Sequence, residues 1–300
     1  MAEITIGSDP EFIVLDMGGH IVPAADFFSD CTDCDPCKDC GKEKREDKCN
    51  TCSDEDCWAC DVCRDEVGEC HECNMCKDNL VDAAIGCDGC SDIGELRPME
   101  ASNPIEHHAH IKNLIHSIHV PDGYKLVAGT LQNNSALGGH IHIGYSCEEA
   151  FDPQDLANYL SYYCGIPLKR IERKIDLKKR GRDEGGYGYY GQYDEKDYGM
   201  EWRMPASWLV SSKIAKAALC LAHVVANDFI DKYHEDIDED MYLEEDDYLE
   251  LLDAPNINKI IKAIKKMDGY KEYKKEIKPI FDLIKKDYVW HVSTNFKELW

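Results

Sequence analysis

The chain has 300 residues, of which 43% are apolar, so it can bury a sizeable core and is not disordered as a whole. Its formal net charge of −25 argues against non-specific nucleic-acid binding, although a local basic site remains compatible with it. The opening MAEITIGSDPEF lacks the basic and apolar regions of a signal peptide, and the longest apolar stretch, residues 217–226, is too short to span a membrane. We therefore expect a cytosolic protein, in which disulfides are a poor explanation for 17 cysteines.

The chain outside its cysteine-rich stretch predicts a mixed α and β fold. Strands are expected at residues 3–6 and 11–15, on either side of Asp9–Pro10. A helix is expected to begin at Asn103–Pro104, where a capping residue precedes a proline. Further helices are expected at residues 207–233, 257–267 and 273–285, and the acidic stretch 234–247 is expected to be a solvated surface or a linker.

Fourteen cysteines fall between residues 31 and 90, and residues 30–77 contain almost no Ile, Leu, Val or Phe. Such a stretch cannot bury an apolar core, so bound metal would have to supply its folding free energy. The recurring Cys-x-x-Cys spacing lets two thiolates meet one ion, and these sulfurs, with His71 as a further ligand, would close about three zinc sites. The candidate ligands are Cys31, Cys34, Cys37, Cys40, Cys49, Cys52, Cys57, Cys60, Cys63, Cys70, Cys73, Cys76, Cys87 and Cys90.

Structural zinc is the preferred interpretation, and two alternatives stay open. The spacing from Cys31 to Cys40 is close to that of iron–sulfur proteins, although ferredoxins place three residues before the fourth cysteine. Disulfide or redox use is the other alternative.

We divide the chain into a catalytic domain, residues 1–30 and 84–300 with a helical extension at its end, and a metal-binding insertion, residues 31–83. The insertion is interpreted as a structural element, with a lid or a docking surface as alternatives.

Four short segments place two ionisable residues two positions apart. Positions i and i+2 lie on the same face of a strand, so each segment would aim both groups at one face. One such segment is weak evidence because ordinary half-buried strands also alternate. The pairs are Asp9 and Glu11 in GSDPEF, Glu95 and Arg97 in GELRP, His140 and His142 in GGHIHIG, and Glu201 and Arg203 in MEWRMP. The opposite face would carry Leu96, Ile141, Ile143, Trp202 and Met204.

This mixture of residue types suits ATP-driven bond formation. Magnesium prefers oxygen ligands from carboxylates and phosphates, and manganese also accepts an imidazole. Arginine binds phosphate with two parallel hydrogen bonds and stabilises the charge that develops during phosphoryl transfer. A sheet surface with these groups would hold metal-bound triphosphate beside a carboxylate substrate.

The same segments carry a resemblance to a known family. GSDPEF, then DG…GELRP, then GGHIHIG, then YGMEWRMPASWL resembles, in this order, the phage-type carboxylate–amine ligase (amidoligase) family of the glutamine synthetase and glutamate–cysteine ligase superfamily. The resemblance covers residues 3–26 and 84–225 and leaves out the cysteine-rich insertion and the residues after 225. It implies an α+β fold with a glutamine-synthetase-like curved antiparallel sheet and helices on its outer face. It also implies ATP and magnesium or manganese as cofactors, and amide formation through an acyl phosphate.

The resemblance implies a role for each matching residue. Glu11, Glu95 and Glu201 resemble the catalytic, metal-binding carboxylates, and Asp9 an accompanying acid. His140 resembles a metal-binding histidine, although the first glycine of the family's Gly-x-Gly-x-His pattern is displaced here, and His142 is its less certain partner. Arg203 resembles the arginine that contacts phosphate or the reacting carboxylate. The other candidate nucleotide-binding residues are Arg97, Arg180 and Arg182. The last two lie in a segment that resembles the family's arginine- and glycine-rich loop, and a mobile basic loop without a catalytic role is the alternative interpretation of this segment.

Several further residues receive no role. A group of histidines on the helix after residue 103 is expected to be exposed: His107, His108, His110, His116 and His119. Four tyrosines, Tyr187, Tyr189, Tyr190 and Tyr193, are expected to pack under the glycine-rich loop rather than stack on adenine. Cys147, Cys164 and Cys220 are expected to be buried apolar residues.

The sequence thus favours an ATP-dependent carboxylate–amine ligase. The alternatives are a non-catalytic zinc-binding interaction module and a metal-dependent hydrolase that uses His140 and His142. The expected partners are an amine and a carboxylate, which a peptide, an amino acid, a cell-wall fragment or a modified nucleotide would supply. No interaction with a membrane is expected.

Overall fold

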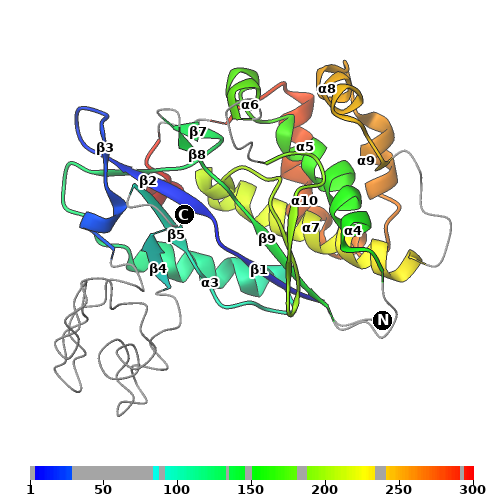
Figure 1. The fold of residues 1–300 in the computed structure, drawn as a ribbon, viewed down its shortest axis with the longest axis horizontal. Helices are drawn as coiled ribbons and strands as arrows, with labels where there is room; N and C mark the ends of the chain where they lie inside the picture. Colours follow the sequence, from blue (N-terminus) through cyan, green and yellow to red (C-terminus); the bar gives the residue numbers. More distant parts are fainter. Residues whose placement is uncertain are drawn as a thin grey trace, which may run out of the picture.

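A computed structural model describes residues 4–28, 84–87, 92–132, 135–145, 151–180, 188–233, 241–290 and 294–300. The predicted metal-binding insertion, residues 31–83, therefore lies outside the described residues, and of the fourteen candidate cysteine ligands only Cys87 lies within them. The described chain combines antiparallel strands with helices, which confirms the predicted mixed α and β class (Figure 1). None of the described helices has both the length and the apolar character needed to cross a membrane.

The strands form two main sheets where we expected one. The first sheet has the order β1 (Ile4–Ser8), β9 (Ile141–Tyr145), β11 (Gly199–Trp202) and β10 (Tyr193–Lys196). The second contains β3 (Ile21–Val22), β2 (Glu11–Leu15), β5 (Ile93–Leu96) and β4 (Ile85–Cys87), and β6 (Lys125–Val127) also pairs with β2. β7 (Leu131–Gln132) and β8 (Ser135–Ala136) form a separate hairpin.

The break between the sheets lies at Asp9–Pro10, between β1 and β2. Proline has no N–H to donate to a sheet, so a hydrogen-bond ladder is readily interrupted at this point. The junction is nevertheless tied together, since the Glu11 N–H donates to the Gly138 carbonyl at 2.9 Å and the Leu96 N–H to the Pro10 carbonyl at 3.1 Å. The two sheets thus meet where the predicted ionisable pairs lie.

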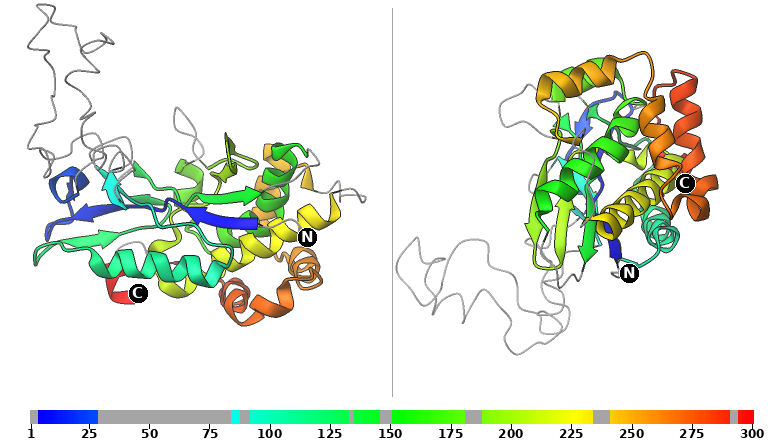
Figure 2. Two further views of the ribbon diagram at one scale, coloured as in Figure 1. Left: turned by 90° about the horizontal axis from the view of Figure 1, so that it is seen from below. Right: turned by 90° about the vertical axis from the view of Figure 1, so that its right-hand side faces the viewer.

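Helices cover one face of the strands (Figure 2). α3 (Pro104–Ser117) and α7 (Ser212–Lys232) contact β1, and α10 (Tyr270–Lys285) packs on α7. The remaining helical segments are α4 (Pro153–Leu160), which continues through a π-helical turn, η5 (Ser161–Gly165), into α5 (Ile166–Lys169), then α6 (Lys174–Arg180), α8 (Glu245–Asp253), α9 (Asn258–Ile264) and the 3-10 turns η1 (Ala24–Asp26), η6 (Trp208–Val210) and η8 (Phe296–Leu299).

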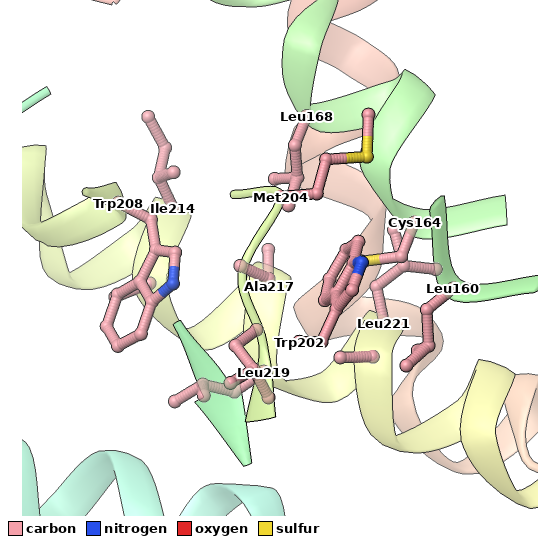
Figure 3. Close-up of a cluster of buried hydrophobic side chains, with 14 of the residues drawn as sticks. Leu160, Cys164, Leu168, Trp202, Met204, Trp208, Ile214, Ala217, Leu219 and Leu221 are labelled. Atoms are coloured by element: carbon pink, nitrogen blue, oxygen red, sulfur yellow. The ribbon is translucent and has the colours of Figure 1, made fainter. Parts of the chain in front are cut away.

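Alternation in the strands sends their apolar side chains to the helices. The five residues predicted for that face, Leu96, Ile141, Ile143, Trp202 and Met204, are all fully buried. Trp202 lies among Leu160, Cys164 and Leu221, so β11 is packed between α4–α5 and α7 (Figure 3). Cys164 and Cys220 are buried as predicted.

Helix boundaries follow capping residues. α3 begins where predicted, because the Asn103 side chain accepts a hydrogen bond from the Ile105 N–H at 2.8 Å and Pro104 stands at the first helical position. The helix predicted from residue 207 begins only at Ser212, capped by Ser211. Ser207 instead donates its hydroxyl hydrogen to the Glu11 carbonyl at 2.5 Å. The acidic stretch is partly helical, since α8 begins at Glu245, and residues 234–240 lie outside the described residues.

Candidate active site

The four ionisable pairs lie at the junction of the two sheets, on the face opposite the buried apolar residues. Asp9 and Glu11 flank the break between β1 and β2, and Glu95 lies in β5 directly opposite Glu11 in the strand register. His140 precedes β9, and Glu201 lies in β11 directly opposite His142. We call these six residues, Asp9, Glu11, Glu95, His140, His142 and Glu201, the carboxylate–histidine cluster.

His140 lies at the centre of the cluster. Its Nδ1 atom is 3.2 Å from Asp9 Oδ1 and 3.1 Å from Glu201 Oε1, and its Nε2 atom is 4.0 Å from Glu11 Oε1. Burial alone would lower the pKa of His140, but the contacts with Asp9 and Glu201 raise it to about 10. In the metal-free protein these contacts favour the protonated imidazole, whose charge the surrounding carboxylates balance.

Glu201 contacts three positively charged side chains. Its Oε2 atom is 2.7 Å from Lys196 Nζ, and its Oε1 atom is 3.2 Å from Arg203 as well as close to His140. Burial would raise the pKa of Glu201, but His140 and Lys196 lower it to about 2. Burial likewise opposes ionisation of Asp9, whose pKa the imidazoles of His140 and His142 hold well below its usual value. Both carboxylates are thus ionised at neutral pH.

Glu11 and Glu95 are both buried and held in defined positions. Glu11 Oε2 accepts a hydrogen bond from the Gly138 N–H at 2.6 Å, which connects the first strand to the GGHIHIG segment. Glu95 pairs with the Nε atom of Arg97 at 2.6 Å, and Arg97 also donates to the Cys87 carbonyl at 2.7 Å. Arg97 therefore anchors Glu95 at the edge of the cluster and contacts the strand that carries Cys87.

His142 is the more exposed histidine of the cluster. Its Nε2 atom is 3.1 Å from Asp9 Oδ2, and its Nδ1 atom is 2.8 Å from the Tyr198 hydroxyl. Tyr198 also stacks on the imidazole, with ring centroids 5.9 Å apart. The ring is thus held with one nitrogen facing the carboxylates.

The donor set fits a divalent cation. One ligand atom each of Asp9, His142 and Glu201 lies within 4.8 Å of the others. Two carboxylates and an imidazole suit manganese, and the remaining carboxylates of the cluster offer the oxygen ligands that magnesium prefers.

The predicted arginines have different surroundings. Arg203 lies beside Glu201 and is also 2.5 Å from Asp194. Arg180 is buried, donates to the Pro205 carbonyl at 3.1 Å, and lines a cavity of about 360 Å³ beside Lys169, Tyr190 and Tyr248. The described residues that line this cavity include no member of the cluster. Arg182 lies outside the described residues.

Three residues near the cluster had no role in the sequence analysis: Asp194, Lys196 and Tyr198. All lie in the hairpin of β10 and β11, in which Asp194 is opposite Glu201. Asp194 and Lys196 repeat the two-residue spacing of the four pairs, so the signal was present in YDEK. No glycine-rich or proline-rich motif marks this strand, so the spacing alone does not distinguish it from an ordinary surface strand.

The prediction of exposed histidines on α3 is wrong for two of them. His107 is fully buried, with its Nε2 atom 2.8 Å from Ser8 Oγ and its Nδ1 atom 2.8 Å from the Met99 carbonyl. His108 is buried against Trp300 and contacts Ser212. The helix presents these side chains to β1 and α7, a tertiary contact that residue type alone does not reveal.

Comparison with known proteins assigns the family. The profile of the phage phiEco32-like COOH·NH2 ligases, type 2, matches residues 80–300. The chain belongs to this family, and its class is therefore that of the carboxylate–amine ligases. The predicted resemblance is confirmed, but the match differs from the predicted extent: it continues through the helices after residue 225 and does not include residues 3–26. No curated protein matches the chain.

The fold is also similar to a solved structure. A bifunctional glutathione synthetase from Pasteurella multocida aligns with a TM-score of 0.51 at 9% sequence identity. The alignment covers 98% of this chain and 48% of that protein, so this chain spans about half its length. At this identity the likeness concerns the fold.

Proposed function

We propose that the protein is an ATP- and magnesium- or manganese-dependent ligase that joins a substrate carboxylate to an amine through an acyl phosphate. One observation carries the proposal. Four carboxylates and two histidines from four distant segments meet at the sheet junction, with Arg97 and Arg203 beside them. Family membership supports the same chemistry.

The proposed reaction has two steps. A substrate carboxylate oxygen attacks the γ-phosphorus of ATP, the bond to the β-phosphate oxygen breaks, and ADP leaves. The amine nitrogen then attacks the acyl carbon, inorganic phosphate leaves with the bonding electrons, and the amine loses a proton to solvent. A divalent cation, when bound, neutralises phosphate charge and orients the triphosphate.

The residues of the chain would position these groups. The cation would be held by Asp9, Glu11, Glu95, His142 and Glu201, and by His140 once its imidazole has lost its proton. Arg203 would stabilise the phosphoryl group during transfer, and Arg97 would contact phosphate at the other edge. Arg180, the last residue of α6, and Arg182 are proposed as further nucleotide-binding residues.

Further parts of the proposal concern architecture. We propose a glutamine-synthetase-like catalytic domain, residues 1–30 and 84–300, in a cytosolic protein. Residues 31–83 are proposed as an insertion that binds zinc, with an iron–sulfur cluster as the alternative. Cys87, a proposed ligand, is buried in β4 and its thiol donates to the Phe28 carbonyl at 3.6 Å.

The test is ADP release from ATP with pooled amino acids and amines. We expect substrate-dependent ADP formation by the wild type and at least a hundredfold loss in Glu201→Ala, in line with removal of a charge-stabilising group, with unchanged zinc content. Glu250→Ala, an exposed position on α8, serves as the matched control. Retained turnover in Glu201→Ala would remove Glu201 from the site. Metal-dependent hydrolysis without ATP would instead favour the hydrolase. Binding of metal without binding of ATP would favour the non-catalytic interaction module.

A further inference from the structure

Lys196 pairs with Glu201 from the exposed side of the carboxylate–histidine cluster. It lies at the end of β10, next to the turn that leads into β11, and its side chain is 34% exposed. Its Nζ atom is 2.7 Å from Glu201 Oε2, whereas the Glu201 side chain is only 4% exposed. A partly exposed lysine thus forms an ion pair with a buried carboxylate.

Both oxygens of Glu201 are occupied by positively charged groups. Oε1 contacts His140 and Arg203, and Oε2 contacts Lys196. Any further cation that binds Glu201 therefore competes with at least one of these groups. The ammonium of Lys196 also lies in the field of Asp9 and Asp194, which raise its pKa together with Glu201, the main cause.

The three cationic neighbours of Glu201 differ in their freedom to leave. His140 is buried and held by Asp9, and Arg203 is held by Asp194. Lys196 has a four-carbon chain and the greatest exposure of the three. Repulsion from a divalent cation would therefore move Lys196 first. The displaced ammonium would then be available to pair with the triphosphate, whose net charge remains negative after one divalent cation has bound.

We propose that Lys196 is an exchangeable counter-ion of the ligase site: it neutralises Glu201 before the divalent cation binds, and turns to the polyphosphate of the nucleotide afterwards. This inference rests on the proposed function and adds a residue that is absent from the predicted set. Lys196 would then weaken cation binding in the free protein and strengthen nucleotide binding in the loaded protein. A residue that only supports the hairpin would not produce these opposite effects.

The test measures the two affinities separately in Lys196→Met. Binding of Mn²⁺ without nucleotide, followed by electron paramagnetic resonance, is expected to be roughly fivefold tighter than in the wild type, the scale of a partly exposed ion pair. Binding of a non-hydrolysable ATP analogue at saturating Mg²⁺, followed by calorimetry, is expected to be about tenfold weaker. Lys196→Arg is expected to retain most of the nucleotide affinity. Lys271→Met, an exposed lysine of α10, is the matched control and should change neither affinity.

The outcomes separate this inference from the proposed function. Unchanged or weaker Mn²⁺ binding in Lys196→Met, with a wild-type melting temperature, would overturn the exchange while leaving the cation site in place. Unchanged nucleotide binding in Lys196→Met would overturn the proposed contact between Lys196 and the polyphosphate. If the wild type bound neither Mn²⁺ nor the nucleotide analogue, the proposed function would fail and the exchange with it.

Discussion

Each of the three glutamates of the cluster has a donor of its own. Glu11 accepts from the Gly138 N–H, Glu95 pairs with Arg97, and Glu201 pairs with Lys196 and Arg203. Removing charged groups from water is costly, so replacing such a network with apolar residues is often neutral or stabilising. Fold stability therefore does not explain the cluster. Fixed positions for charged groups are what phosphoryl-transfer chemistry requires.

Tyr198 is expected to position His142. Removing its hydroxyl in Tyr198→Phe keeps the stacked ring but leaves the Nδ1 atom without the contact at 2.8 Å. Loss of such a support to a metal-binding histidine weakens metal affinity by about 10- to 100-fold, and we expect the lower end because His142 is only one ligand. Mn²⁺ titration of the nucleotide-free protein measures the change.

The matched control is Tyr242→Phe, which removes a hydroxyl that donates to Asp155 at an exposed position. Its Mn²⁺ affinity should equal that of the wild type. An equal loss in both variants, or none in Tyr198→Phe, would remove the positioning role.

His107 makes stability depend on pH. Burial lowers its pKa to about 4, against 6.5 when exposed, so the folded protein holds it neutral while the unfolded chain takes up a proton. The contribution is present above pH 6.5 and is lost as pH falls towards 4, because the unfolded state then binds more protons. Between pH 7 and pH 5 this single group should lower the free energy of unfolding by about 2 kcal/mol.

Urea unfolding at both pH values, in the wild type and in His107→Gln, isolates this effect. The variant should be less stable at pH 7 but should lose about 2 kcal/mol less on acidification than the wild type does. An identical pH dependence in the two proteins would contradict the neutral, buried state of His107.

At the level of elements, the GGHIHIG segment requires a glycine for close packing. A Cβ atom on Gly139 would lie 2.5 Å from the Ala206 carbonyl oxygen and 2.7 Å from Trp208 Cδ1. Gly139→Ala must therefore push β9 away from the chain after β11 and displace His140, at a cost of about 1–3 kcal/mol. Chemical denaturation measures the stability, and Mn²⁺ affinity reports the displacement of His140.

Gly269→Ala provides the comparison, because its added Cβ meets only Val224, at an ordinary 3.4 Å. We expect unchanged or slightly higher stability there, since alanine restricts the unfolded chain more than glycine does. Equal effects at the two positions would show that the close approach at Gly139 relaxes easily.

The orientation of each ionisable pair was predictable, because side chains two positions apart in a strand lie on the same face. For Glu201, Arg203 and Trp202 this was sufficient, since the two polar groups and the tryptophan lie on opposite faces. The split into two sheets was not predictable, because it depends on which strands pair across Asp9–Pro10. The continuous helical stretch α4–η5–α5 was missed as well, since Pro167 and the aromatic residues before it have poor helix propensity. Packing of Tyr162 and Tyr163 in the core outweighs that propensity.

At the scale of the whole molecule, the site exists only in the folded chain. Residues near positions 10, 95, 140 and 201 are brought together by strand pairing between distant segments. In the unfolded chain these groups are far apart, and the net charge of −25 keeps their surroundings negative without creating a site. A cation that binds the cluster therefore stabilises the folded state selectively.

Magnesium should raise the melting temperature through this site. At a free concentration ten times its Kd, a ligand of the folded state adds about 1.4 kcal/mol to the free energy of unfolding, or about 2 °C for a chain of this size. Magnesium is the appropriate probe because it prefers oxygen ligands and does not compete for the thiolates of the cysteine-rich insertion. In Glu201→Ala the magnesium-dependent rise should disappear, because the carboxylate that faces both His140 and Lys196 is gone. A zinc chelator should act equally on both proteins, since the proposed zinc ligands lie in the cysteine-rich stretch and not in the cluster. A magnesium shift that persisted undiminished in Glu201→Ala would place the cation elsewhere and leave the cluster without its proposed ligand.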